Sequence, residues 1–242
     1  MRQTLGLYHA RLVYLWPDRL TDARWLKRCR LHADFDLPAL RITERPIIFV
    51  SLHFGPFETL VYWLRAHGIP VTVLVGRPAP NQRLKQHQYS LSPPAGVPLA
   101  VSVNEMRRMR ELLQPGRRLL VLLDVARGRQ LKVPFDGHSF QLATGAFRLA
   151  ASTGAEVIPC LITENNGWQF DIHLGSPIPR RDLGQKPDFE RAGAHFLQEA
   201  LSVIQCFSSQ CGQRLLSCIS PRSTEPSEMA PDQNDTPSPL GK

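Results

Sequence analysis

Apolar residues in this chain gather in short continuous runs, and most runs are followed by a segment with helical spacing. A short apolar run bounded by polar or turn residues is typical of a strand that is buried on both faces. We therefore expect strands at 46–52, 71–75, 97–101, 118–124 and 156–162, and a short extended piece at 132–135.

The segments between these runs repeat apolar residues at helical spacing, which predicts helices with one buried face. In the segment 56–66, for example, Phe57, Leu60 and Leu64 lie on one side. Helices are expected at 3–31, 56–66, 80–89, 104–114, 141–153 and 187–207.

The alternation of strands and helices predicts an α/β fold with a mixed, mainly parallel sheet that is flanked by helices. Asn165 and Gly167 supply a turn into a further strand at 169–174, so we expect an antiparallel hairpin near one edge. One domain is predicted over 1–221, with N-terminal helices at 1–30. Residues 222–242 are rich in Pro, Ser and Asp, which predicts a disordered tail.

No apolar run is long enough to span a bilayer, which takes about 18 residues. The first 16 residues do place Leu5, Tyr8, Leu12 and Leu15 at helical spacing, with arginines nearby. Two interpretations stay open for this segment: a helix in the membrane interface, or a helix packed on its own domain.

The charge of the chain favours an anionic partner. Twenty-nine Lys and Arg against 21 Asp and Glu give a net charge of +8. Nucleic acid, an acidic carrier protein and an anionic membrane surface would all suit this charge. Helix-turn-helix, zinc and stacking-aromatic signatures are missing from the sequence, so no nucleic-acid partner is expected.

The five cysteines predict neither a disulfide framework nor a metal site. They are odd in number and contain no C-x-x-C pair. Cys206, Cys211 and Cys218 lie close in the sequence, but no histidine follows them at metal-ligand spacing. The pattern fits a reducing compartment and a protein without bound metal.

The candidate chemistry begins at His53, the first residue after the predicted strand 46–52. Ligands of open α/β sheets bind beyond the carboxyl ends of the strands, so a histidine at this point faces the binding crevice. Glu58 follows in the first turn of the next helix. Its carboxylate could accept a hydrogen bond from one imidazole nitrogen and leave the other free to take a proton from a hydroxyl.

The spacing of this pair also fits a purely structural interpretation. A histidine at a strand end can bond locally, and an acid in the first turn of a helix is favoured by the helix dipole. Spacing alone leaves both interpretations open.

Four blocks follow one another along the chain. The first is the H-x4-E block itself, the second an arginine block, the third a strand that ends in an acid, and the fourth a turn, helix and strand. They read His53-Phe-Gly-Pro-Phe-Glu58, Val75-Gly-Arg-Pro-Ala-Pro-Asn81, Leu122-Leu-Asp-Val-Ala-Arg-Gly128 and Val133 through Pro159. In this order they resemble the branch of the glycerolipid acyltransferase superfamily that contains the lipid A biosynthesis acyltransferases of the lauroyl and myristoyl type.

The resemblance implies a role for each matching residue. His53 would be the general base and Glu58 its orienting acid. Arg77 would bind a phosphate or position the polar substrate, and Asp124 would orient a group or contact substrate. A solvated loop arginine and a turn acid remain the alternatives for Arg77 and Asp124.

The same resemblance implies an O-acyltransferase of lipid A biosynthesis type. Its co-substrate would be an acyl thioester, acyl-ACP or acyl-CoA, with no other cofactor, and its acceptor a lipid or glycolipid hydroxyl. The enzyme would lie peripherally on the cytoplasmic face of the inner membrane. Pro56 and Phe57 depart from the family pattern, so a non-catalytic relative that binds lipid or acyl carrier protein is the alternative.

Overall fold

The computed structural model describes most of the chain between residues 26 and 221, and the account below is confined to those residues. The described ranges are 26–33, 36–75, 100–102, 109–111, 113, 115–125, 129–165, 169–183 and 188–221.

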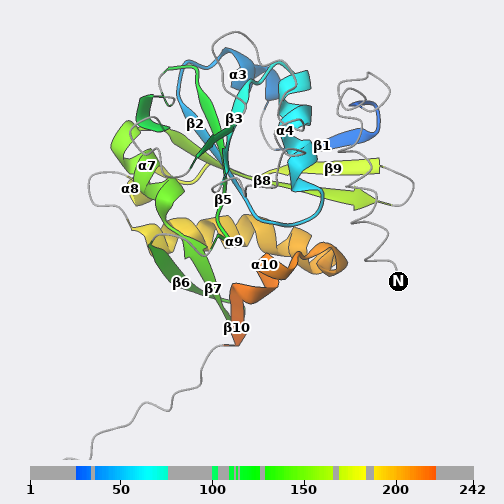
Figure 1. Ribbon diagram of the computed structural model, residues 1–242, viewed down its shortest axis with the longest axis vertical. Coiled ribbons are helices and arrows are strands. Elements are labelled where there is room, and N and C mark those ends of the chain that lie inside the picture. Colours follow the sequence, from blue (N-terminus) through cyan, green and yellow to red (C-terminus); the bar gives the residue numbers. More distant parts are fainter. Residues whose placement is uncertain are drawn as a thin grey trace, which may run out of the picture.

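A seven-stranded sheet forms the centre of the molecule, in the order β1-β9-β8-β2-β5-β3-β4 (Figure 1). Every neighbouring pair is parallel except β8 and β9, which form an antiparallel hairpin one strand away from the edge. The strands are β1 (Cys29–Ala33), β2 (Ile47–Ser51), β3 (Val71–Val75), β4 (Ala100–Ser102), β5 (Arg118–Leu122), β8 (Glu156–Asn165) and β9 (Gln169–Leu174).

Helices cover both faces of this sheet because its central strands are apolar on both sides. In β2, Ile47 and Phe49 pack on one face, whereas Ile48 and Val50 pack on the other. The first face meets α3 (Leu37–Ile42) and α4 (Phe57–Ala66), and the second meets α7 (Gly145–Thr153) and α9 (Phe189–Cys206).

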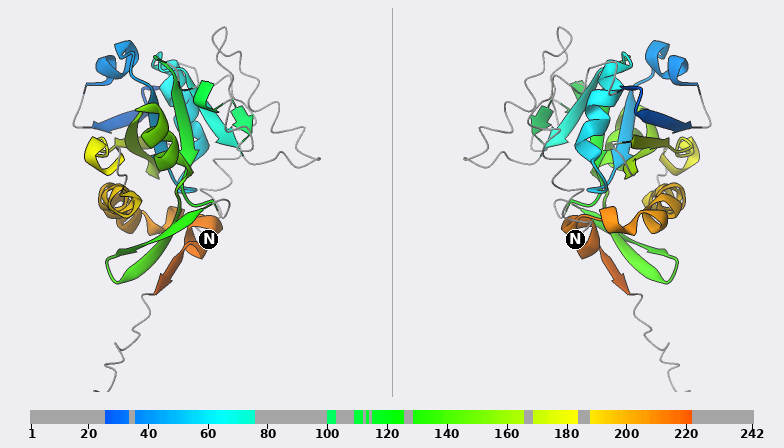
Figure 2. Two further views of the ribbon diagram at one scale, coloured as in Figure 1. Left: turned by 90° about the vertical axis from the view of Figure 1, so that its left-hand side faces the viewer. Right: turned by 90° about the vertical axis from the view of Figure 1, so that its right-hand side faces the viewer.

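A second, three-stranded antiparallel sheet has the order β10-β7-β6. Its strands are β6 (Gln130–Phe135), β7 (His138–Ala143) and β10 (Ile219–Pro221). Helix α9 runs between the two sheets and packs on both (Figures 1 and 2). Three further short helical elements are α8 (Arg180–Leu183), the 3-10 turn η2 (Ser208–Gln210) and α10 (Gln213–Ser217).

The predicted fold class is confirmed: the sheet is mixed and mainly parallel, and its antiparallel hairpin lies near one edge. Two element predictions are wrong. Residues 29–31, expected at the end of the helix 3–31, belong to β1, because the backbone of Cys29–Ala33 pairs in parallel with β9. The helix expected from residue 141 begins at Gly145, because the residues up to Ala143 pair with β6.

Several predicted features lie outside the described residues. They include the helix at 80–89, most of the N-terminal helices and the tail at 222–242. Within the described part of the chain, no helix is both long enough and apolar enough to cross a membrane.

Phe196 of α9 is fully buried and belongs to the apolar core that this helix shares with strands of both sheets. We expect Phe196→Ala to lower the free energy of unfolding by about 3–5 kcal/mol, because it removes buried surface and leaves a cavity. Ile42→Ala is the matched control: its side chain is 83% exposed, and its loss should change stability by about 0.5 kcal/mol or less. Urea denaturation measures both, and equal effects would contradict this packing.

Candidate active site

His53 lies two residues beyond the end of β2, at the carboxyl end of the central strand of the sheet. The turn that follows depends on Gly55, whose φ of 56° lies in the left-handed region that glycine adopts without strain. A Cβ atom on Gly55 would also collide with the carbonyl oxygen of Ile162. This close approach fixes the loop that holds the histidine against β8.

Asp124 fixes the orientation of His53 through two hydrogen bonds. The backbone N–H of His53 donates to Oδ2 of Asp124 at 2.9 Å, and the ring Nδ1 donates to Oδ1 at 2.8 Å. An ionised carboxylate can only accept, so the ring proton is on Nδ1 and the lone pair is on Nε2. The imidazole is thereby held in the tautomer that a general base requires.

The Asp124 side chain is completely buried. A buried carboxylate is costly unless hydrogen bonds satisfy its oxygens, and both Asp124 oxygens bond to His53. Its backbone is held too, because the thiol of Cys218 donates to the Asp124 carbonyl at 3.6 Å. The acid therefore cannot rotate towards solvent without losing both bonds to the histidine.

The imidazole itself is partly open, with 18% of its side chain exposed. Phe57, the first residue of α4, packs against it edge to face, with ring centroids 4.9 Å apart. One side of the ring is therefore apolar, and Nε2 is the nitrogen that remains for a substrate.

The C-terminal segment 207–218 lies against this loop and completes the site. The backbone N–H of Gly212 donates to the His53 carbonyl at 3.2 Å, and that of Gly55 donates to the Gln210 carbonyl at 3.0 Å. A Cβ on Gly212 would lie 2.7 Å from the His53 oxygen, so only glycine fits this approach. Residues that are distant in sequence thus form part of one site.

Arg214 extends from α10 to the open nitrogen of His53. Its Nη1 donates to Nε2 at 3.3 Å. A guanidinium cannot accept a hydrogen bond, so Nε2 must be the acceptor. The contact therefore agrees with the tautomer that Asp124 imposes.

Of the predicted site residues, the structure brings His53 and Asp124 together. Glu58 lies in the first turn of α4, but its side chain is outside the described part of the molecule, as is all of Arg77. Sequence reasoning missed Arg214. A lone arginine 161 positions after the histidine carries no local signal, and only the fold places it there.

No group of three or more His, Cys, Asp and Glu side chains in the described residues could hold a metal ion. None of the five cysteines, which all lie in the described residues, forms a disulfide. Burial raises the pKa of the Cys29 thiol to about 12 and raises that of Cys160 as well, so both thiols stay protonated near neutral pH.

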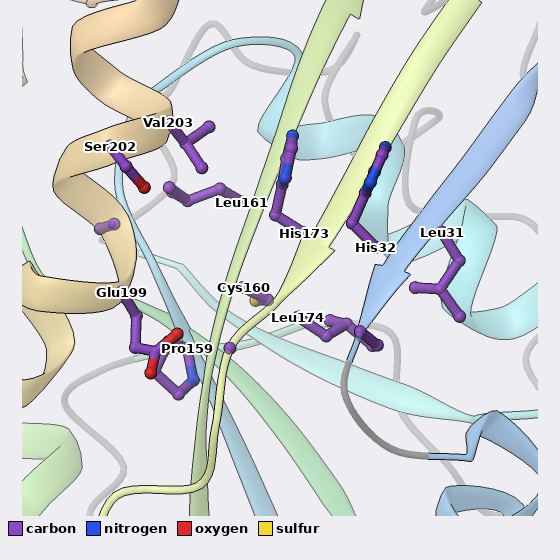
Figure 3. Close-up of a pocket in the computed structure, with 13 residues that line it drawn as sticks. Leu31, His32, Pro159, Cys160, Leu161, His173, Leu174, Glu199, Ser202 and Val203 are labelled. Carbon is purple, nitrogen blue, oxygen red and sulfur yellow. The ribbon is translucent and has the colours of Figure 1, made fainter.

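A groove of about 460 Å³ lies elsewhere, between α9 and the edge formed by β1 and β9 (Figure 3). His32 and His173 stack on its floor with ring centroids 5.0 Å apart. Burial, and then the nearby charge of His32, lower the pKa of His173. His53 and Asp124 are not among the residues that line this groove.

Comparison with known proteins identifies the family of this chain. The sequence profile described as bacterial lipid A biosynthesis acyltransferase matches residues 14–202, which is well over half of the sequence. The chain belongs to this family. It is therefore an acyltransferase of the lipid A and glycerolipid type. No curated protein matches this chain significantly.

A solved acyltransferase has a similar fold. The crystal structure of the 1-acyl-sn-glycerophosphate acyltransferase PlsC from Thermotoga maritima superposes with a TM-score of 0.50 and 13% identity. The match covers 86% of this chain and 84% of PlsC. At this identity the likeness concerns the fold, and it agrees with the α/β architecture described above.

Gly55→Ala tests whether the close approach to β8 positions His53. We expect it to lower acyltransferase activity. The left-handed backbone alone should lower the free energy of unfolding by about 1–2 kcal/mol, and the loss should be larger here because the methyl group also displaces the loop. Gly154→Ala is the control, since its φ is 69° and nothing lies near its Cβ position. Equal losses of stability and activity in the two variants would contradict the packing argument.

Proposed function

We propose that this acyltransferase moves a fatty acyl chain from an acyl thioester to a hydroxyl group of a lipid or glycolipid, with His53 as general base. The observation that carries the proposal is the pair of hydrogen bonds from His53 to the buried Asp124. They leave a basic nitrogen at the end of a central strand, where substrates of α/β folds bind.

In the proposed reaction, Nε2 of His53 takes the proton of the acceptor hydroxyl as its oxygen attacks the thioester carbonyl. The carbonyl oxygen becomes an oxyanion in the tetrahedral intermediate. When the carbon–sulfur bond breaks, the thiolate leaves and takes the proton from the imidazolium. An ester and a free thiol are the products, and His53 returns to its neutral form.

Asp124 contributes to this cycle through charge and tautomer. It holds the proton on Nδ1 before the reaction and lies 2.8 Å from the imidazolium that forms during it. A buried carboxylate stabilises that cation more strongly than a solvated one, because the surroundings screen less. This role, rather than direct contact with substrate, is the one that its complete burial supports.

The donor is acyl carrier protein or coenzyme A carrying the acyl chain, and the acceptor belongs to lipid A type glycolipids or related lipids. The family membership supports the acceptor class. A net charge of +8 supports an acidic carrier protein or an anionic membrane surface as the partner. We propose that the enzyme lies peripherally on the cytoplasmic face of the inner membrane.

His53→Ala is the first test of this mechanism. Acyl transfer from radiolabelled acyl-CoA or acyl-ACP to a lipid extract should fall by about 10²–10⁴-fold, the usual contribution of a general base. The control is Arg148→Gln, an exposed residue on α7, which should leave turnover unchanged. Unchanged turnover in His53→Ala excludes His53 as the base. Inactivity of the wild type with both donors favours a non-catalytic relative that only binds lipid or carrier.

Asp124→Asn tests which acid orients the base. The amide can accept only one of the two His53 donors, so the other contact favours the tautomer with its proton on Nε2. We expect transfer to fall by at least about 10²-fold, while thermal unfolding changes little because the side chains are isosteric. Ring ¹⁵N shifts of His53 report the tautomer directly. Glu58→Gln is the comparison: a tautomer change there, and not in Asp124→Asn, would assign the orienting role to Glu58.

A further inference from the structure

Arg214 forms a hydrogen bond with the atom on which the proposed mechanism depends. Nε2 of His53 must accept the proton of the acceptor hydroxyl, yet the guanidinium of Arg214 already donates to it at 3.3 Å. While this contact lasts, the lone pair of Nε2 is engaged and the position of the hydroxyl is filled. In this arrangement the guanidinium of Arg214 covers the basic nitrogen of His53.

The guanidinium of Arg214 has no carboxylate partner among the described residues. His53 Nε2 is the one side-chain atom there to which it bonds. A guanidinium carries five N–H donors, and an imidazole nitrogen can satisfy only one. The residue as a whole is exposed, and no side-chain partner for the remaining donors is found among the described residues. Such a cation is available to an anion that enters the site.

The backbone around Arg214 is held by its neighbours, so the guanidinium can leave Nε2 of His53 only by a movement of the side chain. Leu215, the next residue, is fully buried. On one side of α10, Gly212 bonds to His53, and on the other, β10 pairs with β7 through Ile219 and Phe140. A long arginine side chain can swing away from Nε2 while this frame stays in place.

We propose that Arg214 is a phosphate-binding residue that uncovers the base: a phosphate group of an incoming substrate draws the guanidinium off Nε2 of His53. The exchange is favourable because a charge-assisted, bidentate bond to phosphate is about twice as strong as a bond to a neutral acceptor. The inference rests on the proposed role of His53 and extends it. Arg214 lies beyond the residues 14–202 that match the family profile, so this device belongs to the C-terminal segment of this chain.

Two parts of the reaction could supply the phosphate. The thioester donor carries phosphate on its pantetheine arm, and the acceptor lipid can carry phosphate beside the hydroxyl. Both present the same chemistry to Arg214. In either case the base becomes free only when a substrate is bound, which limits wasteful hydrolysis of the thioester by water.

The first measurement tests the covered base. Diethyl pyrocarbonate carbethoxylates a free imidazole nitrogen, and peptide mass spectrometry separates His53 from the exposed His138, which serves as the internal reference. Without phosphate, we expect Arg214→Gln to raise the rate at His53 several-fold relative to His138, whereas Arg148→Gln should react as the wild type does. Equal rates at His53 in all three proteins would overturn the covering role.

The second measurement tests phosphate binding, with inorganic phosphate as the probe and ³¹P line widths as the signal. Wild type and Arg148→Gln should bind it, and Arg214→Gln should bind about tenfold more weakly. Equal binding by Arg214→Gln would overturn the proposal. Displacement of the probe by coenzyme A would assign the site to the donor, and displacement by phosphatidic acid in micelles would assign it to the acceptor. Displacement by neither would overturn the assignment to a substrate.

These readouts need no turnover, so they separate the two proposals. If acyl transfer depends on His53 but Arg214→Gln changes neither signal, the proposed function stands and the role of Arg214 fails. If both signals change but His53→Ala keeps its activity, the phosphate site stands and the catalytic assignment fails.

Discussion

The two hydrogen bonds between Asp124 and His53 are the interaction on which the site depends. They join the ends of two neighbouring strands, β2 and β5, whose register is set by parallel pairing from Ile47 to Ser51. Because the acid is buried, it has no alternative partner in solvent, and the histidine becomes its obligatory donor. The sheet thus determines the protonation pattern of the imidazole as well as its place.

The rest of the architecture supports this contact from both sides. Helix α4 places Phe57 against one side of the imidazole ring, and the hairpin β8–β9 supplies the wall that Gly55 approaches. Helix α9 then ties the large sheet to the small one, which carries β10 and so anchors the segment with Arg214. Most of these contacts join residues that are far apart in the sequence.

Much of the fold could be predicted from the sequence, because buried parallel strands leave an apolar pattern that needs no knowledge of their partners. The runs that form β2, β5 and β8 are identified in this way, and so is the position of His53. Cys29–Ala33 is not, since this edge strand contains no continuous apolar run and none of its residues is fully buried. The role of Asp124 follows from its distance to His53 and from its burial. The contact between Arg214 and His53 is visible only in the complete tertiary structure.

The position of residues 207–221 at the end of the described chain has a consequence for folding during synthesis. Chains are synthesised from the N-terminus, so β2, α4 and β5 are made before residues 207–221. The base and its acid can therefore meet on a nascent chain that still lacks α10. Until that segment is made, Arg214 cannot cover Nε2 of His53, so the part of the described chain that is synthesised last is the part that covers the base.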